Sequence, residues 1–432
     1  MAPTSTTSSS CPAKCETGTR LRGDPKASRP RRGWHLAPDR LPRRVPCSPA
    51  QRACSPQRCG RPRGPPISPG AGASMAYRPL RAHYRPGRHV VNNCRRGARG
   101  ARLWLSKDGA KELARALVWR TDKTVTPDLR RRFVALGPAE LDRFRSHLRE
   151  NWSTKDYWNS EIGREQLEAH TIGRLTYDRH EYVPWLNSLH RLDGARVFEI
   201  GCGTGSSLCA LAEQGSDVVA IDVAPESVAV AKARLRLLRL GAQSLHAMNA
   251  TEMDSHFDHQ SFDFVIFFAS LEHMTLEERL RSLRAAWKLL ADNGILCIVE
   301  APNRLWLFDD HTADLPFFHW LPDEMALEYF RQTPRYRASP FDTSAAGAGL
   351  ELTRRGRGVS FHDIELALGP IGGLEFLADR HSFQIEHNAL RRLRYRLSDT
   401  RRYAGLLRRQ RPDLPIGLFL PYLDVAIRKG PA

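Results

Sequence analysis

Long apolar runs are missing from this chain of 432 residues. Its most apolar stretches, VIFFA at 265–269 and ILCIV at 295–299, are far shorter than the roughly 20 residues that a membrane-spanning helix needs. We therefore expect no transmembrane segment. The beginning of the chain also lacks the apolar run of about 7–15 residues that a secretory signal requires, so we expect no such signal there.

Acidic residues are scarce in the first hundred positions. Residues 1–100 hold 21 Lys and Arg against three acidic residues, and so carry nearly all of the formal net charge of +19. Residues 1–75 also hold 13 of the 29 prolines. Such a stretch buries too little apolar surface to offset its ordering entropy. We expect residues 1–100 to form a disordered basic tail.

Three roles stay open for this tail. Its Arg-rich and Ser-rich composition is typical of an organellar transit peptide, although the prolines oppose the amphipathic helix of such a peptide. It can be a basic arm for RNA or lipid, and it is the only part of the chain through which we expect nucleic acid to bind. It can also be an upstream extension, with the natural start near Met75.

Cysteine pairs at complete zinc-binding spacings are absent as well. Six of the nine cysteines lie within residues 1–100, and the short spacings Cys11/Cys15 and Cys54/Cys59 lack the second half of a zinc pattern. We expect no metal site. The distribution favours a reducing compartment, and we expect the protein in the cytoplasm.

Periodic patterns begin after Leu103. Residues 107–195 are expected to be mostly helical, with a long helix around 161–180. Beyond them, short β-branched or aromatic runs alternate with helical spacing. Strands are expected at 196–200, 217–222, 244–248, 262–270, 295–302 and 422–429. Helices are expected at 206–214, at 225–240 and from the capping box Thr275/Glu278 to Asn293-Gly294. This alternation predicts an α/β fold with a doubly wound, Rossmann-like sheet, whose ligands bind at the carboxyl ends of the strands.

A glycine-rich turn follows the first of these strands directly, in VFEIGCGTG at 197–205. Glycine lets the backbone turn sharply and approach a ligand closely. A dinucleotide-binding turn would place its third glycine at position 206, which is Ser206. Asp222 ends the next strand, 21 residues beyond Gly201, where a carboxylate can accept both hydroxyls of a ribose.

In this register, the strand, the turn and Asp222 resemble class I S-adenosylmethionine-dependent methyltransferases over about residues 165–305. The resemblance implies a seven-stranded sheet and S-adenosylmethionine as the cofactor. The cofactor-binding residues implied are Glu199, Gly201, Cys202, Gly203, Gly205, Asp222, Val223, Asn249, Ala250 and Leu271. Plainer roles stay open for Glu199, which can cap the glycine turn, and for Asp222, which can cap a helix.

Two further segments refine the resemblance. Asn249 stands where the family often has an acid that pairs with the adenine amine, and its amide oxygen can accept this bond without the charge. SLEHM at 270–274 resembles the small-molecule branch of the family, whereas DNA amino-methyltransferases carry an N/D-P-P-Y/F tetrapeptide there, which this chain lacks. Glu272 and His273 can act near the methyl acceptor or simply begin the next helix.

Residues 101–432 are expected to form one methyltransferase domain. We expect a helical lid region over 101–195, the cofactor-binding core over 196–303, a substrate-recognition insert over 304–420 and the last strand over 421–430. The lid helix with Arg164, His170 and Arg174 would cover the cofactor if it behaves as in relatives, or it is a packing helix with a solvated basic face. The basic segment 391–411 is expected to be an amphipathic surface helix, either solvated or able to hold an acidic substrate or phospholipid.

The insert begins with aromatic and polar residues in alternation. Its aromatic residues Trp306, Phe308, Phe317, Phe318 and Trp320 are expected to wall a pocket for a small organic or sugar-like acceptor. A hydroxyl acceptor needs a base, for which histidine is suited. Our candidate catalytic residues are His311 and His362, ahead of His319, and each can instead be a structural histidine.

We therefore expect a methyltransferase that uses S-adenosylmethionine to O-methylate a small-molecule or saccharide acceptor. N- or C-methylation stays open. Two other functions also stay open: an RNA- or protein-directed methyltransferase that uses the basic tail, and a non-catalytic cofactor-binding protein.

Overall fold

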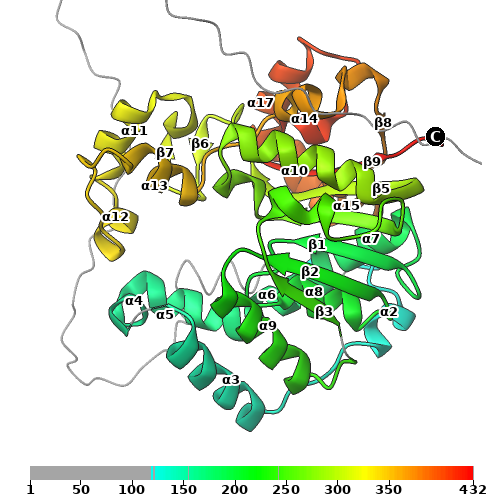
Figure 1. Ribbon diagram of the computed structural model, residues 1–432. Coiled ribbons are helices and arrows are strands. Elements are labelled where there is room, and N and C mark those ends of the chain that lie inside the picture. Colours follow the sequence, from blue (N-terminus) through cyan, green and yellow to red (C-terminus); the bar gives the residue numbers. More distant parts are fainter. Residues whose placement is uncertain (1–117, 120–121, 154, 242, 432) are drawn as a thin grey trace, which may run out of the picture. The chain divides into compact units, whose positions relative to one another are not determined.

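A computed structural model describes residues 118, 119, 122–153, 155–241 and 243–431 (Figure 1). Contacts divide the chain into Met1–Gly97 and Ala98–Ala432, and every described residue belongs to the second unit. The tail expected over residues 1–100 lies outside the described residues. Within the described part, no helix is both long and apolar enough to cross a membrane.

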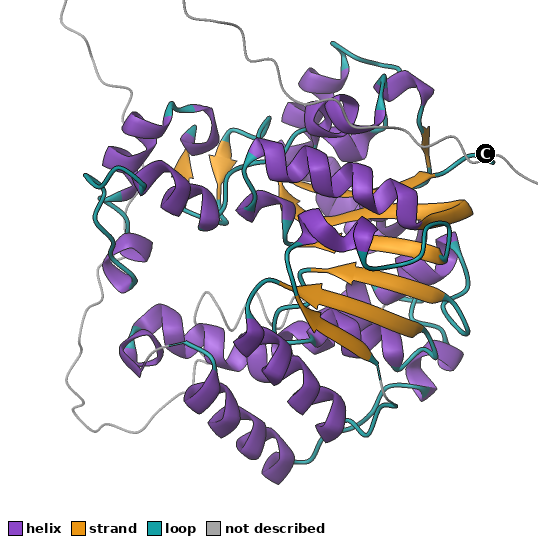
Figure 2. Ribbon diagram, viewed as in Figure 1, coloured by secondary structure: helices purple, strands orange, loops and turns teal. Residues whose placement is uncertain are grey.

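A seven-stranded sheet carries the fold, in the order β3-β2-β1-β4-β5-β9-β8 (Figure 2). The strands are β1 (Arg196–Ile200), β2 (Asp217–Asp222), β3 (Ser244–Ala247), β4 (Phe262–Phe268), β5 (Leu290–Pro302), β8 (Glu375–Phe376) and β9 (Tyr422–Arg428). The first five strands are parallel, and β9 pairs antiparallel with both β5 and β8. The predicted doubly wound α/β fold is confirmed. The strand order reverses between β1 and β4, which places a ligand site at their carboxyl ends.

Helices that precede the sheet come from the region expected to be helical. They are α2 (Pro127–Arg131), α3 (Pro138–Asn151), α4 (Lys155–Asn159), α5 (Glu161–Glu168), the π-helix η1 (Ala169–Gly173), α6 (Arg174–Glu181) and α7 (Val183–Leu189). The segments α5, η1 and α6 follow one another without a break, so the predicted long helix is present. Its central π turn was not predicted.

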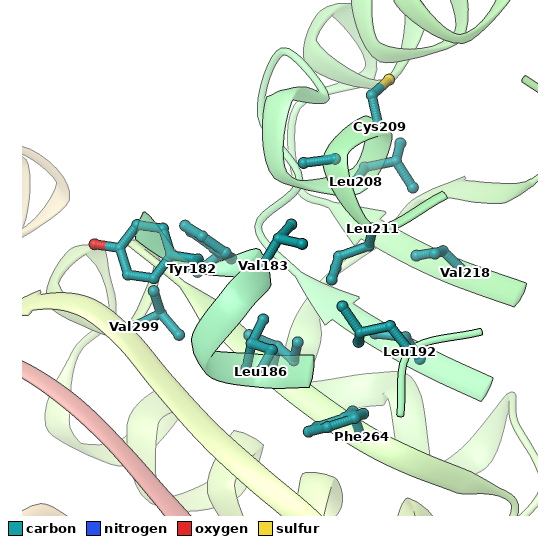
Figure 3. Packing of buried hydrophobic residues seen from close by; sticks show 14 of the residues in the cluster. Tyr182, Val183, Leu186, Leu192, Leu208, Cys209, Leu211, Val218, Phe264 and Val299 are labelled. Carbon is teal, nitrogen blue, oxygen red and sulfur yellow. The ribbon is translucent and has the colours of Figure 1, made fainter. Parts of the chain in front are cut away.

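The two faces of the sheet are buried in separate hydrophobic cores, because successive strand side chains point to opposite faces. One core lies under α6, α7, α8 (Ser206–Ala212), α9 (Pro225–Leu237) and α15 (Arg380–His387). Figure 3 shows part of it, with Val183 and Leu186 of α7 and Leu208 of α8 near Val218 and Phe264 of the sheet. The other core lies under the 3-10 helix η2 (Ala250–Ser255), α10 (Leu276–Leu289) and α14 (Phe361–Leu368).

Helix α10 begins as predicted and ends earlier than predicted. The hydroxyl of Thr275 accepts a hydrogen bond from the backbone N–H of Glu278, whose carboxylate accepts one from the N–H of Thr275. We expected Asn293-Gly294 to end the helix, but β5 already begins at Leu290, which pairs with Phe262. Asn293, with φ of 62°, lies in the irregular stretch between this pair and the regular pairing from Ile295 onward. Strand pairing therefore overrides the local turn preference.

The region expected to be one insert, residues 304–420, divides into two parts. Its first part contains β6 (Phe308–Asp309), β7 (Leu315–Pro316), η4 (Phe318–Trp320), α11 (Asp323–Phe330), α12 (Pro334–Ala338) and α13 (Ala348–Arg354). These elements surround a small core of their own, with Phe318, Phe330 and Leu352 buried. The second part belongs to the main fold, because β8 joins the sheet and α14 and α15 cover its two faces. It also holds η5 (Ile371–Gly373), α16 (Ala389–Leu397), α17 (Asp399–Arg408) and η6 (Ile416–Phe419).

Candidate active site

A cavity of about 620 Å³ lies at the carboxyl ends of β1, β2 and β4, within the usual size range of small-molecule sites. Its walls come from the helical region before the sheet, the glycine-rich turn, the ends of β2 and β4, and the first part of the insert. Seven of the predicted cofactor residues line it: Gly201, Cys202, Gly203, Asp222, Val223, Asn249 and Ala250. Glu199, Gly205 and Leu271 do not line it.

The glycine-rich turn needs glycine for two different reasons. At Gly201 (φ 85°), an added Cβ would lie 2.6 Å from the Cβ of Ser270, so the close approach of β4 excludes a side chain. At Gly203 (φ 48°), which lines the cavity, an added Cβ would have no protein atom within 4 Å. The left-handed backbone at both positions also disfavours other residues.

Asp222 holds this turn in place. One of its carboxylate oxygens accepts a hydrogen bond from the N–H of Gly203 at 2.8 Å, and the other accepts from the N–H of Ala224 at 2.9 Å. Each carboxylate oxygen has two acceptor sites, so each keeps one free toward the cavity. The N-cap of α9 is Ala224, so Asp222 does not cap that helix.

Glu199 lies beneath the turn. Its side chain is fully buried and accepts a hydrogen bond from the hydroxyl of Ser207 in α8, while its Oε2 has no partner among the described residues. Burial raises the pKa of Glu199 to about 7, against the Ser207 hydrogen bond, which lowers it. Glu199 thus fixes α8 against β1 and reaches the cavity only through Ser207, which lines it.

The substitution Glu199→Gln is expected to make stability less dependent on pH. A carboxyl with a folded pKa of about 7 and an ordinary unfolded pKa keeps its proton in the folded state, so the wild type loses stability as pH rises from 4.5 to 7. Glutamine can still accept the Ser207 bond without that cost. We expect the free energy of unfolding in urea to fall between pH 5 and pH 8 by about 2 kcal/mol more for the wild type than for the variant. Parallel pH profiles would contradict this, and Asp217→Asn, at the exposed start of β2, is the control.

The other two residues that lie off the cavity wall are packing residues. Gly205 lies against Ala231 of α9, with 2.9 Å between its added Cβ and the Ala231 Cα. Leu271 is fully buried in the core that contains α10.

Asn249 differs from the prediction. Its side-chain oxygen accepts hydrogen bonds from both the N–H and the hydroxyl of Thr251, each at 3.0 Å, and so caps η2. Both acceptor sites of the oxygen are therefore used. The expected bond from an adenine amine to this oxygen is not available in this arrangement, although Asn249 lines the cavity.

The helical region before the sheet contributes Trp152, which follows α3, and His170 and Arg174 of the predicted lid helix to the cavity wall. Arg164 is not among the lining residues. The His170 ring lies 4.4 Å from the Trp152 ring, and its Nδ1 lies 3.0 Å from the Thr204 hydroxyl in the glycine-rich turn. Burial lowers the pKa of His170 well below its usual value, and nearby Arg174 adds to this effect. The π segment is therefore in direct contact with the glycine-rich turn.

Arg234 of α9 ties these two elements together. Its guanidinium is 1% exposed and donates to the backbone oxygens of His170 and Thr171 in the π segment and of Thr204 in the turn. It also stacks 4.3 Å above the Phe144 ring. An arginine of another helix thus donates hydrogen bonds to main-chain oxygens of both the π segment and the glycine-rich turn.

A carboxylate and two imidazoles converge near the cavity, after the end of β4. Glu272 is fully buried, and its Oε1 lies 3.9 Å from His273 Nε2 and 3.7 Å from His311 Nε2. His273 and His311 line the cavity. Burial raises the pKa of Glu272 to about 8, and burial lowers the pKa values of both histidines. The sequence left the roles of Glu272 and His273 open.

The other two candidate bases lie elsewhere. His319 is buried outside the cavity wall, with its Nδ1 accepting from the N–H of Gly358 and its Nε2 3.2 Å from Asp309. His362 is exposed on α14 and stacks on Phe361. Neither lines the cavity, so of the three only His311 is placed to contact a ligand there.

The expected aromatic walls are also placed elsewhere. None of Trp306, Phe308, Phe317, Phe318 and Trp320 is among the cavity-lining residues. Phe318 is buried in the core of the first part of the insert, and the Trp320 indole donates to the backbone oxygen of Arg304. The aromatic side chains that do line the cavity are Trp152, His170, Phe268, His273 and His311. From the insert, His311 and Arg354 reach it.

Known proteins resemble the part of the chain that contains the glycine-rich turn and Asp222. Residues 198–298 match the family model described as a methyltransferase domain. A ubiquinone biosynthesis O-methyltransferase from Xanthomonas campestris pv. campestris (strain B100) is 34% identical over 157 residues, which is 36% of this chain and 58% of that protein. The protein of the same description from Aliivibrio fischeri (strain MJ11) is 29% identical over 159 residues, covering 37% and 61%. The chain thus spans about three fifths of the length of these curated relatives.

Solved structures overlap only in part. A magnesium protoporphyrin IX methyltransferase from Synechocystis PCC 6803 with bound SAH is 18% identical, with a TM-score of 0.34, over 55% of this chain and 91% of that chain. A SAM-dependent methyltransferase from Methanosarcina mazei is 26% identical, with a TM-score of 0.26, over 28% and 59%. The matched family model identifies a methyltransferase domain at residues 198–298, and the curated relatives support the resemblance of this part of the chain to class I S-adenosylmethionine-dependent methyltransferases.

Proposed function

We propose that the chain binds S-adenosylmethionine in the 620 Å³ cavity and transfers its methyl group to an oxygen atom of a small acceptor. The observation that carries this proposal is the pairing of Asp222 with the open turn at Gly203. Together they present main-chain atoms and a carboxylate with free acceptor sites on one wall of the cavity.

The donor side fits each part of the nucleoside. The free acceptor sites of Asp222 suit the two ribose hydroxyls. Val223 is 74% exposed and lines the cavity with Met248 and Ala250, which offers an apolar surface to the adenine ring. Arg174 also lines the cavity, and its half-exposed guanidinium suits the carboxylate of the methionine part.

The part of the cavity wall that we assign to the acceptor is polar. His273, His311 and Arg354 line it, and the Arg354 guanidinium is held by the carboxylate of Glu278 at 2.6 and 2.7 Å. Such fixed polar groups suit a hydroxyl-bearing small molecule. The description of the curated relatives as O-methyltransferases supports oxygen as the accepting atom.

Methyl transfer from a sulfonium is an in-line displacement, so the protein chiefly aligns the acceptor, the methyl group and the sulfur. The glycine-rich turn fixes the sulfonium end, and the first part of the insert fixes the acceptor. The acceptor oxygen must lose its proton beside His311, and a neutral imidazole suits that position. A saccharide acceptor and an RNA- or protein-directed activity remain predictions from the sequence.

Calorimetry on the full chain tests the donor site. We expect S-adenosylmethionine to bind, and Asp222→Ala to weaken binding about 100-fold, because both the ribose contact and the support of the turn are lost. Glu226→Ala, an exposed acid in the first turn of α9, should bind like the wild type. A wild type that binds NADH instead, or neither compound, would refute the proposal.

Methyl transfer is tested on a metabolite extract, with S-adenosylmethionine deuterated in its methyl group. We expect a product that carries the label on oxygen, formed by the wild type and by Glu226→Ala but not by Asp222→Ala. A label on nitrogen or carbon would overturn the assignment of the accepting atom and leave the donor site standing.

A further inference from the structure

Three atoms with lone pairs point toward one position at the acceptor side of the cavity. Glu272, His273 and His311 each supply one metal-binding atom, and these atoms all lie within 4.8 Å of one another. The residues come from the segment between β4 and α10 and from the segment between β6 and β7. Either hydrogen-bond donors or a bound cation can satisfy the lone pairs of these three atoms.

The hydrogen-bond partner of His273 fixes its tautomer. Its Nδ1 lies 2.9 Å from the backbone oxygen of Arg354, which can only accept, so Nδ1 carries the proton of the neutral ring. The Nε2 atom, which faces Glu272, is therefore left with a bare lone pair. A metal-binding histidine usually donates its other ring N–H to a carbonyl or carboxylate in this way.

The same argument holds for His311. Its Nδ1 lies 2.9 Å from the hydroxyl oxygen of Thr312, and this hydroxyl donates its own hydrogen to the backbone oxygen of Gly356 at 2.9 Å. The Thr312 oxygen must then accept from Nδ1–H. The Nε2 atom of His311 consequently also presents a lone pair toward Glu272.

The carboxylate of Glu272 lacks hydrogen-bond partners. Its side chain is fully buried, and neither carboxylate oxygen has a hydrogen-bond partner among the described residues. The nearby Arg279 donates to the backbone oxygens of Leu271 and Glu272 and pairs with Asp363 instead. In its deprotonated form, Glu272 would face two bare nitrogens without a positive partner, and a bound cation would supply that partner.

We propose that Glu272, His273 and His311 bind a divalent first-row transition metal ion. Ligands about 2.0–2.2 Å from one ion are separated by roughly 3–3.5 Å. The three atoms, now 3.7 and 3.9 Å from Glu272 to the histidines and all within 4.8 Å of one another, must therefore move closer together when the ion binds. Two imidazoles and a carboxylate favour zinc, manganese or iron over calcium or magnesium. This proposal replaces the expectation, drawn from the cysteines, that the chain holds no metal site.

The place of the ion gives it a role that rests on the proposed function. Three protein ligands leave coordination positions open, and the two histidines line the cavity. An acceptor hydroxyl bound there loses its proton to solvent more readily, because the ion stabilises the oxyanion. The oxygen then forms its bond to the methyl carbon as the carbon–sulfur bond breaks, and the electron pair of that bond stays on S-adenosylhomocysteine. His311 is then a ligand and not the base.

Metal binding is tested on the full chain with Mn²⁺ after removal of bound metal with a chelator. Mn²⁺ is the probe because, of the first-row divalent ions, it binds thiolates weakly, and six cysteines lie in residues 1–100. Electron paramagnetic resonance should show one bound Mn²⁺ per chain. Glu272→Gln, which keeps the shape and removes the charge, and His311→Gln should each weaken binding at least about 100-fold.

Matched controls lie on the exposed surface. Glu277→Gln and His259→Gln should bind Mn²⁺ like the wild type. Glu272→Gln should unfold at no lower temperature than the metal-free wild type, so that lost binding does not reflect lost folding. A wild type that binds no Mn²⁺, or a Glu272→Gln variant that binds it equally well, would overturn the proposal.

Binding of S-adenosylmethionine separates this proposal from the proposed function. Both Glu272→Gln and His311→Gln should keep the wild-type affinity for S-adenosylmethionine, because neither side chain is among the groups to which we assign the nucleoside and the methionine part. Mn²⁺ binding without any S-adenosylmethionine binding would refute the proposed function and leave the metal site standing. The reverse result would refute the metal site alone.

Discussion

The substitution Gly203→Val is expected to weaken the binding of S-adenosylmethionine about a thousandfold, a loss of about 4 kcal/mol. Gly203 lines the cavity, and an added Cβ would find no protein atom within 4 Å, so we expect the valine side chain to extend into the cavity. It therefore occupies space that the ligand needs, while the surrounding protein stays in place. Calorimetry on the purified variant measures the effect.

Gly194→Val is the matched control for backbone strain. Gly194 also has a positive φ, of 84°, and open space around an added Cβ, but it lies outside the cavity. Both variants should lose about 1–2 kcal/mol of stability, because a non-glycine residue is forced into the left-handed region. Only Gly203→Val should bind S-adenosylmethionine more weakly than the wild type. Equal affinities in the two variants would show that the ligand does not lie against the turn.

Arg234→Met is expected to lower the free energy of unfolding by about 4 kcal/mol. The buried guanidinium donates to three backbone oxygens, those of His170, Thr171 and Thr204. Methionine fills much of the volume but removes all three hydrogen bonds to buried main-chain oxygens, and we expect this cost to exceed the gain from no longer burying a charge. Burial lowers the pKa of Arg234 to about 10, so the charge persists at neutral pH.

Urea denaturation measures this effect, with Arg236→Met as the control, because Arg236 is exposed on the same helix. Arg234→Lys should recover less than half of the loss, since an ammonium cannot reproduce the planar arrangement of donors. The Arg234→Met variant should also bind S-adenosylmethionine more weakly, because the π segment is no longer held to the turn. If Arg234→Met proves as stable as Arg236→Met, the bridge has no structural role.

The sheet was predictable from sequence because its strands are short apolar runs with sharp boundaries. The helix after β4 was equally clear, since Thr275 and Glu278 form a capping box that depends only on neighbours in sequence. Strand β8 was missed, because its two residues, Glu375 and Phe376, show no alternation of their own. Its pairing with β9 across some 50 positions creates it.

The donor side of the cavity was predicted better than the acceptor side for a similar reason. Gly201, Gly203 and Asp222 belong to one strand–helix–strand unit, in which β1 and β2 pair directly. The acceptor side joins Glu272 to His311, which are 39 positions apart, and only tertiary packing brings them together. Composition alone could not show that His319 is buried with its Nε2 atom 3.2 Å from Asp309.

Phe318, Phe330 and Leu352 belong to a hydrophobic core that is separate from the two cores at the faces of the sheet. The segment that carries His311 and Arg354 can therefore accumulate mutations without disturbing the glycine-rich turn. Evolution can then exchange one acceptor for another while the methyl donor stays the same. A lineage of such enzymes would diversify mainly within residues 304–355, and directed evolution toward a new product should begin there.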